Sequence, residues 1–192
     1  EPDARRPVLY MPDGGMAEDF LHIAGLLQVS IGNGSVAPVI LVGIENTERR
    51  RDLTGPTTVA RDSAIAPRVG GSVSFRRFIR EELIPLIESR YATTTQRGII
   101  GESLAGLFVV ETLLLEPDLF DTYVAFDPSL WWNNAALNSS ARDLLRRMDS
   151  SPRTLHLASS SEPELASLAL ELVEVLRAHA SASLAWSHRE MP

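Results

Sequence analysis

The sequence predicts an α/β fold built on a mostly parallel sheet of about six strands, with helices on both faces of the sheet. Two observations support this prediction. Short apolar runs alternate along the chain with longer segments in which apolar residues recur at every third or fourth position. Turns rich in Gly, Pro, Asp and Ser separate the two kinds of segment. Regular alternation of strand and helix favours parallel pairing, because each helix returns the chain to the same end of the sheet.

Six strands are expected, and each is a short apolar segment. The run at 38–44 is continuous and β-branched, which suits a strand that is covered on both faces. The run at 7–11 ends in a Pro-Asp-Gly-Gly turn, which is typical of a buried strand that stops abruptly. The expected strands are residues 7–11, 38–44, 98–100, 122–126, 154–158 and 183–186.

Five helices are expected between these strands. The segment 74–87 has apolar residues on one face, with Ser74 as its N-cap and Pro85 as a site where a kink is allowed. Residues 46–71 show no periodicity, and so long a loop in a compact domain is either functional or mobile. The expected helices are residues 17–28, 74–87, 104–115, 135–148 and 164–178.

The composition indicates one folded domain and excludes several classes of function. With 192 residues, 44% of them hydrophobic, the chain can bury one substantial core, and we expect residues 1–192 to form a single domain. A net charge of −7 argues against nucleic-acid binding, which needs clustered Lys and Arg. The absence of Cys excludes disulfides and thiol catalysis, and no set of His, Asp and Glu has metal-ligand spacing. We therefore expect neither a metal nor another cofactor.

The sequence predicts no membrane span, because it contains no apolar stretch of about 18 residues. The chain begins at Glu1 rather than at Met, which is compatible with a removed export signal. The sequence decides neither the compartment, cytoplasmic or exported, nor the oligomeric state.

The segment 101–106 carries the clearest functional signal. It reads Gly-Glu-Ser-Leu-Ala-Gly and places Ser103 in a Gly-x-Ser-x-Gly pattern between an expected strand and an expected helix. The glycines are needed because side chains at their positions would collide with neighbouring backbone in so tight a turn. Ser103 is therefore the predicted nucleophile, and the alternative is a serine that only caps the following helix.

Two backbone N–H groups are predicted to hold an oxyanion near Ser103. The N–H of Leu104 lies at the start of the expected helix, where the helix dipole favours negative charge. The second donor is expected in the loop after an earlier neighbouring strand, and the N–H of Gly15 is the candidate. In the alternative for that turn, Asp13 simply caps the helix that follows.

A serine nucleophile needs a base and an orienting acid, in the chain order serine, acid, histidine. Glu162 follows the fifth expected strand and is the predicted acid, with Glu164 as the alternative nearby. His188 is the candidate base, because it alone among the histidines follows the last expected strand. It comes two residues after Trp186, and the alternative is that it still belongs to that strand. The remaining histidines are expected to be structural: His22, His156 and His179.

Four segments together resemble the esterases of the α/β-hydrolase superfamily, which include enterochelin esterases, S-formylglutathione hydrolases and relatives of mycolyltransferases. The resemblance covers most of the chain and depends on the order and spacing of the segments. It implies a three-layer sandwich of the α/β-hydrolase type, with Ser103 as nucleophile and Leu104 and Gly15 as oxyanion donors. The segments are residues 8–14, residues 42–54, residues 101–106 and residues 128–132.

The resemblance also implies a substrate-facing role for the loop at residues 46–54. A guanidinium of Arg49 or Arg51 could hold an anionic group of a substrate there, although a merely solvated loop is the alternative. Trp131 and Trp132 are candidates for an acyl or aryl wall of the site, and plain core is the alternative for both.

The chain departs from the family pattern at both ends. Family members usually have strands before the one at 7–11 and carry the catalytic histidine in a loop beyond the last strand. We therefore expect a chain that lacks those strands and that loop. Two interpretations stay open: either His188 acts as the base, or the base is absent.

The predicted function is hydrolysis of a small or medium carboxylic ester through an acyl-enzyme intermediate. Acyl transfer to another alcohol would use the same residues, and a non-catalytic binding module is the alternative from another class. A dinucleotide-binding fold is disfavoured, because Gly32-Asn33-Gly34 precedes a strand and lacks the third glycine. The expected partner is thus a small-molecule ester and not a nucleic acid.

Overall fold

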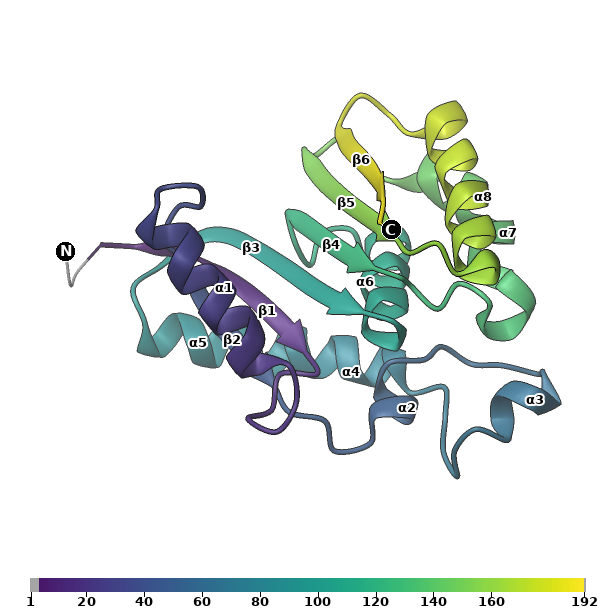
Figure 1. Ribbon diagram of the computed structural model, residues 1–192, viewed down its shortest axis with the longest axis horizontal. Coiled ribbons are helices and arrows are strands. Elements are labelled where there is room, and N and C mark those ends of the chain that lie inside the picture. Colours follow the sequence, from purple (N-terminus) through teal and green to yellow (C-terminus); the bar gives the residue numbers. More distant parts are fainter. Residues whose placement is uncertain (1–3, 192) are drawn as a thin grey trace.

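The fold is a six-stranded parallel sheet with helices packed against it (Figure 1). The computed structural model describes residues 4–191. The strand order across the sheet is β2-β1-β3-β4-β5-β6, and every neighbouring pair is parallel. The predictions of an α/β fold and of six parallel strands are confirmed. The strands are β1 (Arg6–Pro12), β2 (Ile40–Ile44), β3 (Thr93–Glu102), β4 (Thr122–Phe126), β5 (Arg153–Ser159) and β6 (Leu184–Glu190).

Two strands extend further than their apolar runs indicated. β3 already pairs with β1 at Thr93, and β6 pairs with β5 as far as Glu190. The added residues are mostly polar, so they form no apolar run, although Thr itself favours strands. One consequence bears on the site: His188 lies within β6 rather than in a loop after it.

The helices include all five that the sequence predicts and two short ones within the 46–71 loop. Within the described residues no helix has the length and apolarity that a membrane span requires. The helices are α1 (Phe20–Gly32), α2 (Arg49–Asp52), α3 (Ala60–Ser63), α4 (Ser72–Phe78), the π-helical turn η1 (Ile79–Leu83), α5 (Ile84–Arg90), α6 (Leu104–Leu115), α7 (Trp132–Arg147) and α8 (Pro163–His179).

The helix predicted at 74–87 differs in its start and in its middle. Gly71 rather than Ser74 is its N-cap, and a π-helical turn separates α4 from α5. Pro85 has no N–H, and its ring crowds the carbonyl four residues earlier, which belongs to Glu81 within that turn. The wider π turn therefore lies where the proline disturbs regular helical bonding.

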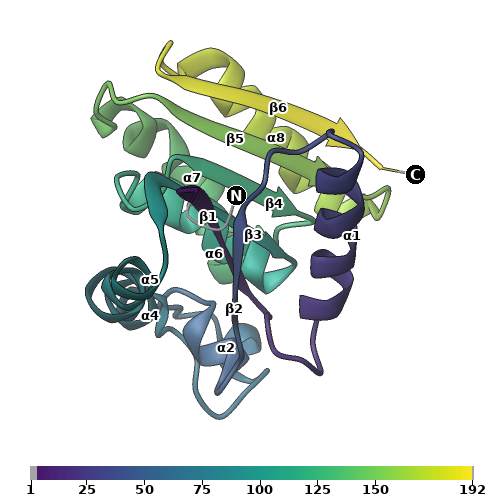
Figure 2. The same ribbon diagram turned by 90° about the vertical axis from the view of Figure 1, so that its left-hand side faces the viewer.

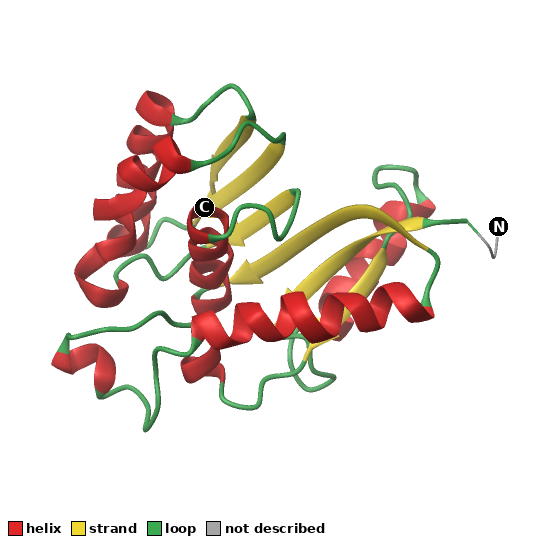
Figure 3. Ribbon diagram, turned by 180° about the vertical axis from the view of Figure 1, so that it is seen from behind, coloured by secondary structure: helices red, strands yellow, loops and turns green. Residues whose placement is uncertain are grey.

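Helices cover the two faces of the sheet unequally. α1 lies across one face on the side of β1 and β2 (Figures 1 and 2), and none of its residues is buried. Seen from behind, the other face lies under α4, α5, α6, α7 and α8 (Figure 3). Every residue of α6 from Leu104 to Leu114 is buried there, and the apolar ones form one cluster with buried side chains of the strands. Among the described helices, α6, which follows Ser103, thus has the largest share of buried residues.

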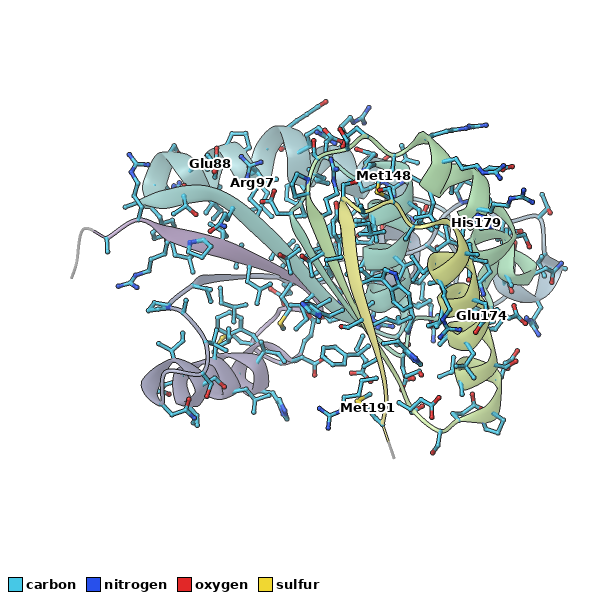
Figure 4. The ribbon with its side chains drawn as sticks, turned by 90° about the horizontal axis from the view of Figure 1, so that it is seen from above. Glu88, Arg97, Met148, Glu174, His179 and Met191 are labelled. Carbon is cyan, nitrogen blue, oxygen red and sulfur yellow. The ribbon has the colours of Figure 1, made fainter. Side chains whose placement is uncertain are left out.

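The carboxyl ends of all six strands meet at one edge of the sheet, because the strands are parallel. In such sheets ligands bind at this edge, where the connecting turns gather. Met191 marks the edge at the end of β6 in Figure 4, whereas His179 ends α8 on the way back to the opposite edge. His179 therefore lies away from the turns that could form a site.

Candidate active site

The turn between β3 and α6 has the strained shape that the glycine pattern predicts. Ser103 has φ 56° and ψ −117°, a backbone conformation that residues other than glycine rarely adopt. A Cβ atom at Gly101 would lie 2.6 Å from the backbone carbon of Ala105, and one at Gly106 would lie 2.7 Å from the backbone oxygen of Phe126. Both positions therefore require glycine, and the turn lifts Ser103 out of the sheet edge.

Neighbouring backbone fixes Ser103 on both sides. Its N–H donates to the carbonyl of Phe126 at 3.0 Å, and its carbonyl accepts from the N–H of Ser129 at 3.0 Å. The hydroxyl oxygens of Ser103 and Ser129 are 3.3 Å apart, and Ser129 is only 3% exposed. Sequence reasoning assigned no role to Ser129. Its place in the turn after β4, the neighbouring strand, was the available signal.

The two predicted oxyanion donors differ in whether their N–H group already has an acceptor. Leu104 is the first residue of α6, so its N–H has no acceptor within the helix and is free to serve a ligand. The N–H of Gly15 donates to Glu18 Oε2 at 2.6 Å, in the turn that follows β1. Asp13 and Gly101 line the same pocket of about 190 Å³, so the turn after β1 and the turn after β3 are neighbours.

Arg49 and Arg51 of the 46–54 loop are paired with carboxylates. Arg49 donates two hydrogen bonds to Asp13, from Nε at 2.7 Å and from Nη2 at 2.8 Å. The hydrogen bonding of the Arg49 guanidinium to Asp13 raises the pKa of Arg49. Arg51 binds Asp52 and Glu48, with shortest distances of 2.7 Å and 2.6 Å. Both guanidinium groups thus hold loop carboxylates in this structure, and their predicted role toward substrate stays a prediction.

The two tryptophans occupy different environments. Trp132 is 5% exposed and belongs to the core, and its Nε1 donates to the carbonyl of Gly55 at 2.8 Å. Trp131 is half-buried, and the guanidinium carbon of Arg61 lies 5.9 Å from its ring centre. Of the two, Trp131 has the open position that a wall of a substrate site needs.

Glu162, the predicted acid, is exposed and acts as the N-cap of α8. Its Oε2 accepts the N–H of Leu165 at 2.8 Å. Asp127, which sequence reasoning did not single out, joins the turns after β4 and β5 by accepting the N–H of Ser160 at 2.6 Å. Its φ of 41° is a second strained value close to the nucleophile turn. Strain of this kind cannot be read from sequence unless a glycine marks it.

His188, the candidate base, is half-buried in β6, and its Nε2 lies 2.9 Å from Ser159 Oγ. It occupies the same row of the sheet as Gly101, with β4 and β5 between them. At about 4.8 Å per strand, the two backbones are roughly 14 Å apart. Within residues 4–191 the structure does not bring Ser103, Glu162 and His188 into contact.

Among the described residues, Ser103 Oγ makes no hydrogen bond with the other histidines either. His156 is exposed in the middle of β5 and bonds through Nδ1 with Ser187 Oγ at 2.9 Å. His22 lies on α1 and lines the pocket that Gly101 and Glu102 also line. Among the described residues no three His, Asp or Glu side chains are grouped as metal ligands would be.

Comparison with known proteins relates this geometry to a family. Residues 1–181 match the model of the family described as "Putative esterase". The chain belongs to this esterase family. The family match covers almost the whole sequence, and it agrees with the resemblance that four separate segments indicated.

Individual relatives of this esterase-family chain are siderophore esterases. The chain is 39% identical over 149 residues to the ferri-bacillibactin esterase BesA of Bacillus subtilis, an alignment that covers 69% of this chain and 50% of the relative. It is 37% identical over 76 residues to the siderophore enterobactin esterase of Emericella nidulans, covering 38% of this chain and 25% of that protein. The aligned region is thus half the Bacillus relative's length and a quarter of the fungal one's.

Solved structures share the fold over nearly the whole chain. An IroE-like serine hydrolase from Shewanella oneidensis superposes with a TM-score of 0.88 at 29% identity, covering 98% of this chain and 64% of that one. The BES protein from Bacillus cereus gives a TM-score of 0.82 at 26% identity, covering 98% and 78% of the two chains. The predicted α/β-hydrolase type of fold is therefore confirmed.

Proposed function

We propose that this chain carries the reacting centre of a serine carboxylic ester hydrolase, with Ser103 as the nucleophile. One observation supports the proposal most strongly. Ser103 holds a left-handed backbone conformation on a strand-to-helix turn that requires glycine on both sides. Strain of this kind costs about 1–3 kcal/mol and is concentrated at functional sites. A serine that only capped α6 would need none of it.

The reaction follows from the groups around that serine. The Oγ of Ser103 attacks the carbonyl carbon of the ester, and its proton passes to a base. The carbonyl oxygen becomes an oxyanion, which the N–H groups of Leu104 and Gly15 would hold. The alcohol then leaves with a proton, and water releases the acid from the acyl-serine. Glu162 and His188 stay predictions as acid and base.

We further propose that the ester belongs to the siderophore class. Support comes from the relatives, because the Bacillus protein is named a ferri-bacillibactin esterase and the Emericella protein a siderophore enterobactin esterase. Both are longer than the matched region, so the substrate of the whole protein is part of the proposal. The half-buried indole of Trp131 could pack against an aromatic part of such a substrate.

Covalent labelling tests the nucleophile directly. The chain is treated with a fluorophosphonate probe, and the modified residue is located by mass spectrometry. We expect labelling at Ser103 that is lost in Ser103→Ala and retained in Ser161→Ala, an exposed serine in the turn after β5. A folded chain that labels nowhere, or equally in Ser103→Ala, would overturn the proposal.

Hydrolysis assays test the substrate class. Enterobactin, ferri-bacillibactin and p-nitrophenyl butyrate are incubated with the chain, and the products are separated by chromatography. We expect Ser103-dependent cleavage of a siderophore ester. Cleavage of the p-nitrophenyl ester alone would keep the ester hydrolase and reject the siderophore substrate.

A further inference from the structure

The carboxylate of Glu18 is bound by donors from two separate turns. Its Oε2 accepts the N–H of Gly15 at 2.6 Å and lies 3.4 Å from the backbone nitrogen of Asn46. Its Oε1 accepts from Asn46 Nδ2 at 2.8 Å. Glu18 and Asn46 are 28 residues apart in the chain, so these contacts join the turn after β1 to the turn after β2. One carboxylate thus takes two backbone donors and one side-chain donor.

These donors are held in place without Glu18. The N–H of Gly14 donates to the carbonyl of Ile44 at 3.0 Å, which ties the two turns together. A Cβ atom at Gly14 would lie 2.4 Å from the Cα of Gly43, so the backbones approach as closely as glycine permits. The turns therefore keep their spacing through backbone contacts.

The side chain of Asn46 is also oriented by groups other than Glu18. Its Nδ2 donates a second hydrogen bond to Asp13 Oδ1, and Asp13 is in turn fixed by the two hydrogen bonds from Arg49. With one amide hydrogen on Asp13, the other is directed at the carboxylate of Glu18. Arg49 thus acts on this cluster as a positioning residue.

The turn after β1, whose Gly15 N–H the carboxylate holds, neighbours the turn after β3, because Asp13 and Gly101 line the same pocket. β1 pairs with β3 up to Tyr10 and Ile99, so the two strands reach the carboxyl edge of the sheet side by side. The N–H that Glu18 occupies belongs to Gly15, the predicted second oxyanion donor. A carboxylate carries the same charge and the same acceptor oxygens as a developing oxyanion or the acid released by ester hydrolysis.

We propose that the backbone N–H groups of Gly15 and Asn46, with Asn46 Nδ2, form a binding site for small carboxylates, and that Glu18 fills it from within the chain. The ligand class is a monocarboxylate such as the acid product of ester cleavage. Its relevance to catalysis rests on the proposed function, because the site shares the Gly15 N–H with the oxyanion. Glu18 then competes with substrate for that donor and lowers the resting reactivity of Ser103.

The binding step is tested without any reaction at Ser103. Glu18→Ala removes the internal ligand, and acetate is titrated while the backbone amide signals of Gly15 and Asn46 are followed by NMR. We expect saturable shifts of both signals in the millimolar range of acetate for Glu18→Ala, and none in the unchanged chain. Asp19→Asn is the matched control, because it removes the neighbouring negative charge and leaves Glu18 in place.

Two further variants keep the test decisive. Glu18→Ala combined with Asn46→Ala should lose the acetate response. Glu18→Gln keeps the side-chain shape and serves if Glu18→Ala does not fold; we expect acetate to bind it, but more weakly than Glu18→Ala. A folded Glu18→Ala or Glu18→Gln chain whose Gly15 and Asn46 signals ignore acetate would overturn the site.

The link to catalysis has its own measurement. We expect Glu18→Ala to react with the fluorophosphonate probe at least about threefold faster than the unchanged chain, and acetate to reverse the gain. An acetate response in NMR with no labelling of any variant would reject the esterase and keep the site. Labelling that is indifferent to Glu18 and to acetate would show that Glu18 only closes the turn.

Discussion

The turns that follow β3 and β5 occupy equivalent places in the fold, yet their backbones differ. Both join a parallel strand to a helix at the same edge of the sheet. After β3, Ser103 has φ 56° and ψ −117°, whereas after β5, Glu162 has φ −62° and ψ 121° in an ordinary extended conformation. The turn after β3 has a strained backbone. In the turn after β5 the backbone is relaxed, and the Glu162 side chain accepts a capping hydrogen bond from the N–H of Leu165.

The helices that follow the two turns also differ, because the helix after the strained turn is the more deeply buried. α6 is buried from Leu104 to Leu114, while α8 buries only four residues on one side. Strained backbone persists only where its surroundings over-determine it. The comparison therefore indicates that the more deeply buried helix supports the strained turn, and that an equivalent position at the sheet edge does not by itself produce strain.

Gly101→Ala should give the largest effect, because the added Cβ would lie 2.6 Å from the Ala105 backbone carbon. We expect a loss of about 3 kcal/mol or more in the free energy of unfolding, measured by urea denaturation. Gly25→Ala is the control: nothing lies within 4 Å of its Cβ position in α1, and alanine there should stabilise by about 0.5–1 kcal/mol. Unchanged stability of Gly101→Ala would contradict the requirement for glycine at this turn.

Arg76→Met tests whether the anchoring of α6 sustains the strain. Arg76 is 1% exposed; its Nε binds Glu116 Oε1 at 2.9 Å, and its Nη1 lies 3.4 Å from Oε1 of the buried Glu111 on α6. Removing the cation leaves that carboxylate buried, so we expect a loss of about 3 kcal/mol in urea denaturation. Arg80→Met, which breaks surface pairs only, should cost less than about 1 kcal/mol.

The same variant carries a pH signature. Desolvation raises the pKa of Glu111 above its usual value, with Arg76 opposing the rise. A raised carboxyl pKa means that the folded chain binds the proton more tightly than the unfolded chain, so stability is lost as pH rises through the folded pKa. Without Arg76 the pKa of Glu111 in the folded chain rises further. The loss of unfolding free energy in Arg76→Met should therefore be smaller at pH 5 than at pH 8. A deficit independent of pH would mean that Glu111 is not the group left unpaired.

Ser103→Gly should separate strain from reactivity. Glycine accepts a φ of 56° without steric cost, so we expect about 1 kcal/mol of added stability together with complete loss of probe labelling. Ser161→Gly, in the relaxed turn after β5, should lower stability slightly because glycine gains freedom in the unfolded chain. Thermal unfolding of both variants makes the comparison, and a destabilised Ser103→Gly would contradict it.

The strained turn after β3 could be predicted from sequence because its determinants are local. Gly101, Ser103 and Gly106 lie within six residues, and the strand and helix on either side have clear patterns. The contact of Glu18 with Asn46 could not be predicted, since it depends on how two turns 28 residues apart approach each other. The sequence left open whether His188 follows the last strand or still belongs to it, because the polar end of β6 forms no apolar run. Only the pairing with β5 shows that the strand continues through His188.

The smallest effects are expected at the residues that the sequence assigns to acid and base. In the arrangement described, Glu162 caps α8 and His188 bonds with Ser159. We therefore expect Glu162→Gln and His188→Ala to change the rate of Ser103 labelling by less than about twofold. Glu162→Gln should lower the free energy of unfolding by roughly 0.5 kcal/mol through the weaker cap.

Ser159→Ala is the informative companion to these variants, because it frees the imidazole of His188 from its partner. If labelling falls tenfold or more in His188→Ala, the imidazole must travel from β6 toward β3 during the reaction, and Ser159→Ala should then accelerate labelling. If neither His188→Ala nor Ser159→Ala changes the labelling rate, Ser103 reacts without help from side chains of β5 and β6. The strained turn after β3 would then serve the reaction, and the relaxed turn after β5 would serve only the fold.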